Sequence, residues 1–153
     1  MIASISTVMN TTPEGLWNKI RKPKSLQYVA APILSFLPQE DTDLSEDWQL
    51  DKEYKLKLYM LKFIALGEHR IVLKKMDIAS NEIESNEYGK LAKVWNHTMR
   101  WKSINSKQIE YTDIIEIKAG LLTVFIWLFA HTYYRYRQRR WKSLLSVEKI
   151  KSE

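Results

Sequence analysis

A histidine and an aspartate interrupt two rows of apolar residues in the last third of the sequence. His97 falls in step with three large side chains at two-residue spacing: Trp95, Met99 and Trp101. Asp113 keeps the same step with Ile109, Tyr111, Ile115 and Ile117. Residues two apart on a strand share one face, so both rows should face the interior of a sheet. A turn centred on Asn105 would place His97 opposite Asp113, Met99 opposite Tyr111 and Trp95 opposite Ile115.

A buried imidazole beside a carboxylate can serve two purposes, and the sequence leaves both open. The pair can satisfy its own hydrogen bonds while it orients two strands, as most buried polar groups do. It can also anchor the polar part of a ligand or act as an acid–base group. A nucleophilic triad would need a serine or threonine against the same ring, which spacing alone does not show, so no catalytic residue is assigned. His69, His97 and His131 lack the spacing of a metal site, and neither a metal nor a cofactor is expected.

The longest apolar stretch, residues 119–145, predicts a C-terminal helix that packs against these strands. Its first 16 residues carry no formal charge, and its second half is basic and aromatic. A membrane span needs about 20 apolar residues, so a helix buried against protein is the preferred interpretation. One stripe at helical spacing consists of Leu122, Ile126, Phe129 and Tyr133. The large apolar residues that would need cover from a loop, a second subunit or a lipid surface are Val124, Trp127 and Leu128.

The composition is that of one globular domain covering residues 1–153, with 45% hydrophobic residues and no cysteine. The N-terminus has neither the basic start nor the continuous apolar run of a signal peptide, so the expected location is the cytoplasm. The net charge is +6, and basic residues gather after Tyr134. Cations near the C-terminal end of a helix complement its dipole, and no nucleic-acid-binding motif accompanies them. No nucleic acid partner is therefore expected.

Apolar periodicity predicts seven strands and three helices. The strands are expected at residues 2–9, 33–37, 53–60, 69–74, 81–88, 93–102 and 108–118, with an acidic loop at 39–52 and a turn at 66–68. Thr12 and Pro13 mark the start of a short helix, and a second short helix is expected at 24–30. Tight turns between consecutive strands imply antiparallel pairing. The predicted fold class is α+β, with a seven-stranded antiparallel sheet wrapped around a long C-terminal helix and two short helices after the first strand.

Several short motifs accompany this order of elements. They are Glu87-Tyr88-Gly89, Trp95-x-His97, Tyr111-Thr112-Asp113, Ala119-Gly120 and, in the helix, Tyr134, Arg137, Gln138 and Trp141. With the element order, they resemble the START/polyketide-cyclase (SRPBCC) superfamily and its helix-grip fold. The resemblance implies a cavity between sheet and helix that binds lipids, sterols, polyketides or other apolar ligands. Some members of the superfamily catalyse cyclisation or dehydration, but they share no single catalytic residue set, so the resemblance assigns no catalytic role here.

We therefore expect the protein to bind a small hydrophobic, lipid- or polyketide-like ligand between the sheet and the helix. The predicted binding residues are Trp95, His97, Met99, Trp101, Tyr111, Asp113, Leu122, Phe125, Ile126, Phe129 and Tyr133. One alternative is a cyclase- or dehydratase-type enzyme that uses His97 and Asp113, although binding without catalysis is preferred. The other is an interaction module that docks through the apolar helix, as a homodimer or on a membrane surface, without crossing the membrane.

Overall fold

Seven antiparallel strands form one sheet in the computed structural model, which describes residues 1–39 and 41–152 and the side chains as far as Val147. The strands are β1 (Ile2–Met9), β2 (Leu34–Pro38), β3 (Glu53–Met60), β4 (Ile64–Asp77), β5 (Glu82–Gly89), β6 (Val94–Asn105) and β7 (Gln108–Lys118). Their order across the sheet is β1-β7-β6-β5-β4-β3-β2, so β1 and β2 form its edges. Glu40, in the predicted acidic loop, lies outside the described residues.

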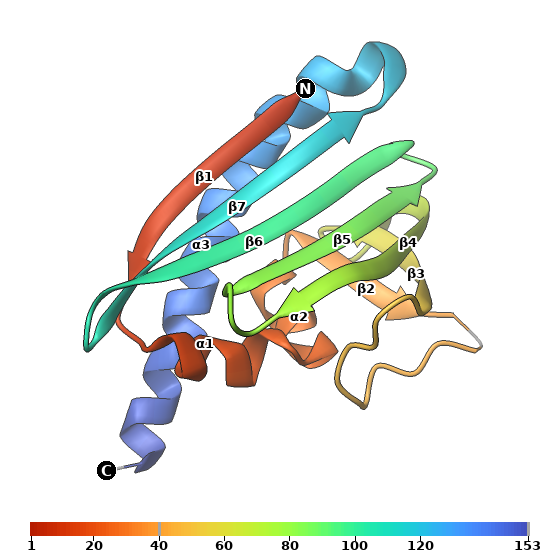
Figure 1. Cartoon of the computed structure of the whole chain (residues 1–153). Helices are drawn as coiled ribbons and strands as arrows, with labels where there is room; N and C mark the ends of the chain where they lie inside the picture. The colour runs from red at the N-terminus through yellow and green to blue at the C-terminus, as the bar shows by residue number, and fades with distance from the viewer. Residues whose placement is uncertain (40, 153) are drawn as a thin grey trace.

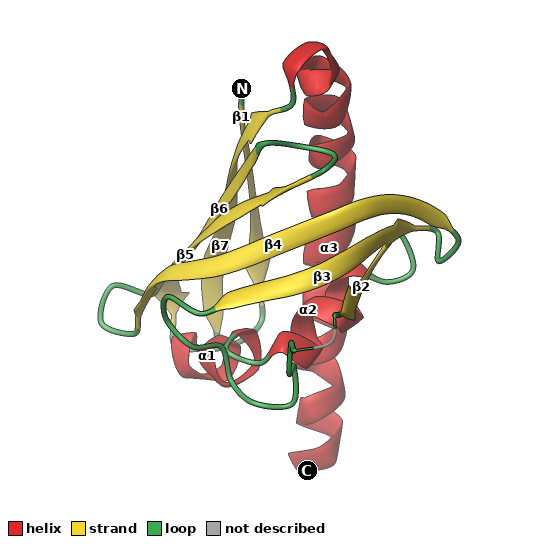
Figure 2. Ribbon diagram, turned by 90° about the vertical axis from the view of Figure 1, so that its right-hand side faces the viewer, coloured by secondary structure: helices red, strands yellow, loops and turns green. Residues whose placement is uncertain are grey.

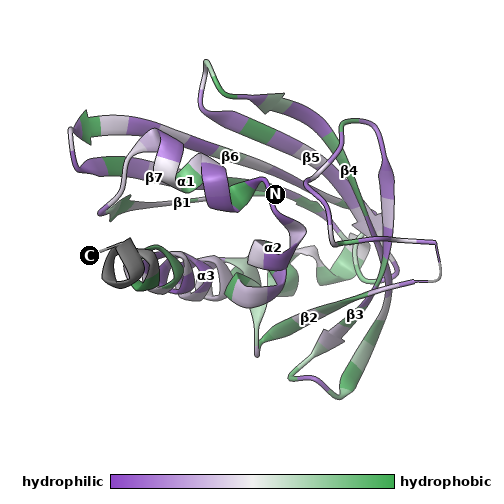
Figure 3. Ribbon diagram, turned by 90° about the horizontal axis from the view of Figure 1, so that it is seen from below, coloured by the Kyte–Doolittle hydropathy of each residue, from purple (hydrophilic) through white to green (hydrophobic). Residues whose placement is uncertain are grey.

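The sheet curves around one long helix. The helices are α1 (Pro13–Ile20), α2 (Pro23–Ala30) and α3 (Thr123–Ser152), and a short 3-10 turn, Gly120–Leu122, precedes α3. α3 runs along one face of the sheet and contacts β1, β7 and α2 (Figure 1 and Figure 2). Seen from below, the sheet bends around the space beside α3, and α2 lies next to that helix (Figure 3). The predicted fold class and element order are confirmed.

The two short helices begin where the sequence places helix-starting residues. The Thr12 hydroxyl accepts a hydrogen bond from the Gly15 N–H at 3.1 Å, and Pro13 occupies the first turn, where a missing N–H costs nothing. Pro23 begins α2 in the same way. Leu16, on α1, and Val29, on α2, are fully buried. The two helices thus fill the space at one end of the curved sheet, beside α3.

The pairing of β6 with β7 differs from the predicted register by two residues. His97 lies opposite Ile115, Met99 opposite Asp113 and Trp101 opposite Tyr111. The pairing is irregular between Ser103 and Asn105, next to the turn. The irregularity beside the turn moves the centre of the hairpin, which turn residues alone did not indicate. A shift of two residues leaves every side chain on its predicted face, so both apolar rows still point inward.

The turn between β3 and β4 was predicted at the wrong residues. The chain reverses at Leu61–Phe63, and the predicted turn at residues 66–68 lies inside β4. Leu61 and Lys62 both have positive φ, 50° and 70°, at positions where no glycine or asparagine marks a turn. Gly67, with φ of 96°, instead accommodates a bulge where the pairing shifts between Leu58 and Tyr59.

The first turns of α3 are only partly covered. Trp127 lies against β1, where its ring N–H donates to the Ile2 carbonyl at 2.8 Å. Val124 and Leu128 are each more than half exposed, so no loop of the described chain covers them. Within the residues that the structure describes, α3 and the other helices all fall short of the length and apolar character that crossing a bilayer requires.

Gly89 permits a close approach of β5 to β4, and we expect Gly89→Ala to be strongly destabilising. A Cβ at this position would lie 2.2 Å from the Glu68 carbonyl oxygen, in the backbone of the neighbouring strand. Forcing the strands apart should lower the free energy of unfolding by about 3 kcal/mol, measured by urea denaturation. Gly120→Ala is the matched control, because a Cβ there meets nothing within 4 Å and only the positive φ of 58° opposes it, at about 1 kcal/mol. Equal losses in the two variants would contradict the close-approach explanation.

Candidate ligand-binding cavity

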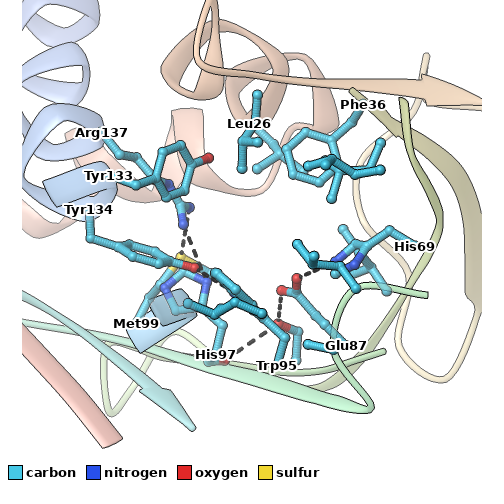
Figure 4. A pocket seen from close by; sticks show the side chains of 18 of the residues that line it. Leu26, Phe36, His69, Glu87, Trp95, His97, Met99, Tyr133, Tyr134 and Arg137 are labelled. Carbon is cyan, nitrogen blue, oxygen red and sulfur yellow. Dashed lines mark hydrogen bonds and ion pairs between the residues drawn. The ribbon is translucent and has the colours of Figure 1, made fainter. Parts of the chain in front are cut away.

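A cavity of about 240 Å³ lies between α3 and the concave face of the sheet. It exists because α3 packs against β1 and β7, while the strands from β3 to β5 curve away from the helix (Figure 3). Most of the lining side chains are apolar, which is usual for small-molecule sites. The charged or imidazole-bearing side chains that line it, together with one serine, are His69, Ser85, Glu87, His97 and Arg137 (Figure 4).

Seven of the predicted binding residues line this cavity. They are Trp95, His97, Met99, Phe125, Ile126, Phe129 and Tyr133. The first three come from β6 and the other four from α3. All of them except Phe125 were identified from periodicity, which decides the face of a strand or helix on which a side chain lies.

The other four predicted binding residues do not line the cavity. Trp101 lies beyond it, 6.2 Å from the Trp17 ring of α1. Tyr111 and Asp113 are fully buried behind His97, because β7 lies directly under α3. Leu122 is half exposed in the 3-10 turn, because the regular helix begins one residue later and the stripe loses its first member.

The predicted contact between His97 and Asp113 is present and lies in the interior. His97 Nε2 is 2.7 Å from Asp113 Oδ1, and both residues are buried. They are diagonal neighbours across β6 and β7 rather than direct partners, a separation that a histidine ring can bridge. The contact was therefore predicted correctly despite the wrong register.

Asp113 accepts hydrogen bonds from three side chains on three elements. Besides His97, the Tyr111 hydroxyl donates to Oδ1 at 2.8 Å, and the Gln138 amide donates to Oδ2 at 2.9 Å. Gln138 also donates to the Ile5 carbonyl of β1 at 2.8 Å. Burial acts to raise the pKa of Asp113, but the His97 hydrogen bond and the positive charge of Arg137 outweigh it and hold the pKa below its ordinary value of 3.8. Asp113 is therefore a buried, satisfied carboxylate.

The other ring nitrogen of His97 faces Arg137. An arginine side chain can only donate, so Nη1 of Arg137 donates to Nδ1 of His97 at 3.3 Å, and Nε2 of His97 donates to Asp113. This arrangement is the neutral tautomer of the imidazole. Because both ring nitrogens are engaged, His97 has no nitrogen free to take a proton from a molecule in the cavity.

A second histidine–carboxylate pair lines the cavity and was not predicted. His69 Nε2 is 2.9 Å from Glu87 Oε2, and the Ser85 hydroxyl donates to Glu87 Oε1 at 2.7 Å. Burial acts to raise the pKa of Glu87, but the contact with His69 outweighs it and lowers that pKa. The signal was present in the sequence, since His69 is in step with Ile71 and Leu73, and Glu87 is in step with Ile83 and Ser85. A search for polar residues in apolar rows on every strand would have found both.

Arg137 is the third polar feature of the cavity. It is only 4% exposed, and besides His97 it contacts the Met99 sulfur at 3.6 Å through Nη2. Its nearest carboxylate oxygen among the described residues is Asp113 Oδ1, 4.0 Å from Nη1. In the sequence, Arg137 stands out only as part of the helix motif with Tyr134, Gln138 and Trp141. Its position four residues after Tyr133, on the same helix face, could have placed it in the cavity.

No group of three or more histidine, aspartate or glutamate side chains suited to a metal ion occurs among the described residues. His131 lies apart from the other two histidines, with its ring 4.4 Å from that of Trp127 on α3. What the cavity offers chemically is a largely apolar wall with one buried cation, Arg137, and one satisfied carboxylate, Glu87, while Asp113 lies behind the wall.

No family model and no curated protein matches this chain. Solved structures do match it over nearly its whole length. Protein CV1439 from Chromobacterium violaceum has a TM-score of 0.74 at 9% identity, covering 94% of this chain and 96% of that chain. Protein Ms6760 from Mycobacterium smegmatis has a TM-score of 0.71 at 9% identity, covering 96% and 92%.

A third structure, Ara h 8.0201, has a TM-score of 0.67 at 8% identity and covers 96% of this chain and 98% of that chain. The chain has the helix-grip fold. Identities this low show the helix-grip architecture alone, so the assignment of function depends on the side chains of this chain.

We expect Asp113→Asn to lower the free energy of unfolding by about 3–5 kcal/mol. The reason is that the buried guanidinium of Arg137 would lose its nearest carboxylate, which lies 4.0 Å away. The carboxylates of Asp113 and Glu87 have folded-state pKa values below their ordinary 3.8 and 4.5. Their stabilisation is therefore complete above the ordinary pKa values and is lost as the pH falls from those values through the lower folded-state ones. Urea denaturation at about pH 7 and about pH 3 should show a smaller pH effect in the variant than in the wild-type protein.

Asp47→Asn is the control for this experiment. Asp47 pairs with Arg21 at 3.1 Å on the surface, where such a pair contributes about 0–1 kcal/mol. A loss in Asp113→Asn no larger than that in Asp47→Asn would show that the buried carboxylate is not important for stability.

Proposed function

We propose that the protein binds a small hydrophobic ligand, of lipid or polyketide type, in the cavity between α3 and the sheet. The observation that carries this proposal is a cavity of about 240 Å³ with mainly apolar walls and a few fixed polar groups. A packed core of the same composition would have no such space, because protein interiors are close-packed. We also infer that the chain is a divergent member of the START/polyketide-cyclase superfamily, on the basis of its helix-grip fold and its sequence motifs.

The geometry supports binding better than base catalysis. A cyclase or dehydratase that used His97 as a base would need a ring nitrogen facing the substrate. Nε2 of His97 is held by Asp113 at 2.7 Å, and Nδ1 faces Arg137 at 3.3 Å. His97 is thus better suited to holding Arg137 in place than to accepting a proton.

Entry to the cavity runs past the first turns of α3. Phe125 lines the cavity yet is 70% exposed, and Phe129, one turn later, is half-buried. The two rings therefore form part of the mouth. Because both the mouth and the wall behind it are apolar, this route suits an apolar ligand.

Phe129→Arg should weaken the binding of N-phenylnaphthylamine, a neutral apolar fluorophore, by roughly tenfold or more, because a charge would stand in the path of the ligand. Binding is measured by the rise in fluorescence on titration. Phe63→Arg is the matched control, since Phe63 is 76% exposed and does not line the cavity. If the wild-type protein does not bind the fluorophore, or if both variants bind it like the wild type, the proposed cavity function is wrong.

The start of α3 favours a second function, docking on an anionic membrane surface. Four apolar residues at three- and four-residue spacing share one exposed face: Leu121, Val124, Phe125 and Leu128. Leu121 is 98% exposed. Two exposed lysines precede this face: the Lys93 N–H donates to the Lys118 carbonyl at 3.0 Å, and the Lys118 ammonium lies 3.0 Å from the Glu116 carboxylate. Apolar residues flanked by lysines suit an anionic lipid surface.

Leu121→Glu should reduce binding to vesicles of phosphatidylcholine mixed with phosphatidylserine by roughly tenfold, because a leucine no longer enters the lipid and a negative charge approaches it. Sedimentation with the vesicles measures the bound fraction. Val147→Glu is the control, because it adds the same charge at an exposed site near the other end of α3. A wild-type protein that does not sediment with these vesicles would exclude membrane docking. Light scattering that shows a dimer dissociated by Leu121→Glu would assign the surface to a second copy instead.

A further inference from the structure

We propose that the ligand of this cavity carries a carboxylate, which enters first and is bound by Arg137 and Tyr133 at the inner end, while its apolar part extends toward Phe125. This inference rests on the proposed ligand-binding function and adds to it the chemical class of the ligand and its direction. Three observations support it: the hydrogen-bonding groups that line the cavity, their order along α3, and the buried positive charge of Arg137.

One row of α3 leads from the mouth of the cavity to its interior. Phe125, Phe129, Tyr133 and Arg137 follow one another at four-residue spacing, so they lie on the same side of the helix. All four line the cavity. Their exposure falls from 70% at Phe125 to 3% at Tyr133 and 4% at Arg137. The row is therefore apolar at the mouth and polar at its inner end, which matches a ligand with an apolar tail and a polar head.

The two carboxylates in and behind the cavity already receive hydrogen bonds from the protein. Asp113 receives hydrogen bonds from His97, Tyr111 and Gln138 on its two oxygens. Glu87 receives one from Ser85 on Oε1 and contacts His69 through Oε2. A ligand that offered only donors would find no free carboxylate oxygen here without displacing one of these partners.

The donors are not satisfied in the same way. Nε of Arg137 is buried and has no partner among the described residues, and Nη2 contacts only the Met99 sulfur, a weak acceptor, at 3.6 Å. The Nε–Nη2 edge of the guanidinium thus lacks an oxygen acceptor. The Tyr133 hydroxyl points into the cavity (Figure 4) and makes no hydrogen bond to another described residue. Burial raises the pKa of Tyr133, so this hydroxyl keeps its proton and remains a donor.

A carboxylate fits these donors better than other acceptors do. A buried cation is costly unless an anion pairs with it, and the nearest oxygen of Asp113 is 4.0 Å away and engaged by other donors. A planar carboxylate can meet one edge of a guanidinium with two parallel hydrogen bonds. Arg137 is the one arginine among the described residues that line the cavity, which also holds the carboxylate of Glu87. A singly charged head therefore suits this cavity better than a phosphate, which carries more negative charge. One more donor, from Tyr133, would complete the site.

The inference is tested by the competition of decanoate, 1-decanol and methyl decanoate with N-phenylnaphthylamine for the wild-type protein. The three probes share a chain and differ in the head. Decanoate should bind roughly tenfold or more tightly than the other two, because charge-assisted hydrogen bonds to a buried cation exceed those to a neutral oxygen. Arg137→Met, which keeps an unbranched apolar stem and removes the guanidinium, should bring the ratio of the acid to the alcohol to about one or below.

Two further variants separate the binding role of Arg137 from a role in folding. Arg135→Met makes the same change at an exposed position of α3 and should leave the ratio unchanged. Tyr133→Phe should reduce the ratio less than Arg137→Met does. Circular dichroism verifies that each variant is folded, and the comparison of the three probes on the wild-type protein stands even if Arg137→Met does not fold. Displacement by the alcohol or the ester as effective as that by the acid would overturn the carboxylate and leave the cavity function intact. No displacement by any of the three would count against both.

Discussion

The buried carboxylate of Asp113 is the constraint on which the interior of this protein depends. It lies on β7, receives hydrogen bonds from β6 through His97 and from α3 through Gln138, and Gln138 in turn bonds to the β1 backbone. A fully buried aspartate is stable only when its oxygens receive hydrogen bonds, so β6 and α3 are held where His97 and Gln138 reach that carboxylate. Gln138 also holds β1 next to α3. The helix is thereby fixed in rotation as well as in position, because Gln138 and the adjacent Arg137 must both face the sheet.

The cavity follows from this attachment. α3 is held against β1 and β7, and the strands from β3 to β5 curve away from it (Figure 3), so a cavity remains between them. His97 and Arg137 lie at the part of the cavity next to that carboxylate, and the apolar residues of α3 lead outward to an exposed Phe125. The same network that stabilises the fold therefore sets the chemical character of the inner end of the cavity. The second pair, His69 with Glu87, supplies an independent polar position on β4 and β5.

Residues on the two central strands show how far periodicity reaches. The inward direction of His97 and Asp113 followed from their place in apolar rows, and it held although the predicted register was wrong by two residues. The turn at Leu61–Phe63 was missed because leucine and lysine at positive φ give no signal in the sequence, whereas Gly67, which was read as a turn, serves a bulge. Among the predicted lining residues, Trp101 and Leu122 were misplaced because each lies just beyond an end of the cavity. Periodicity therefore predicts the direction in which a side chain points, but not how far along the strand or helix the cavity extends.

By itself, the sequence determined the number, type and order of the strands and main helices and, on the two central strands, the face on which each side chain lies. These properties are local, because a repeat of two or of about 3.6 residues is imposed by the backbone geometry of each element. Only the tertiary structure decided that His69 meets Glu87, that Arg137 reaches His97, and that a space remains beside α3. Those outcomes depend on bulges, on strand curvature and on where the helix rests, which are set by contacts between residues far apart in the chain. The tertiary structure also decides which hydrogen-bond donors in the cavity are left without a partner.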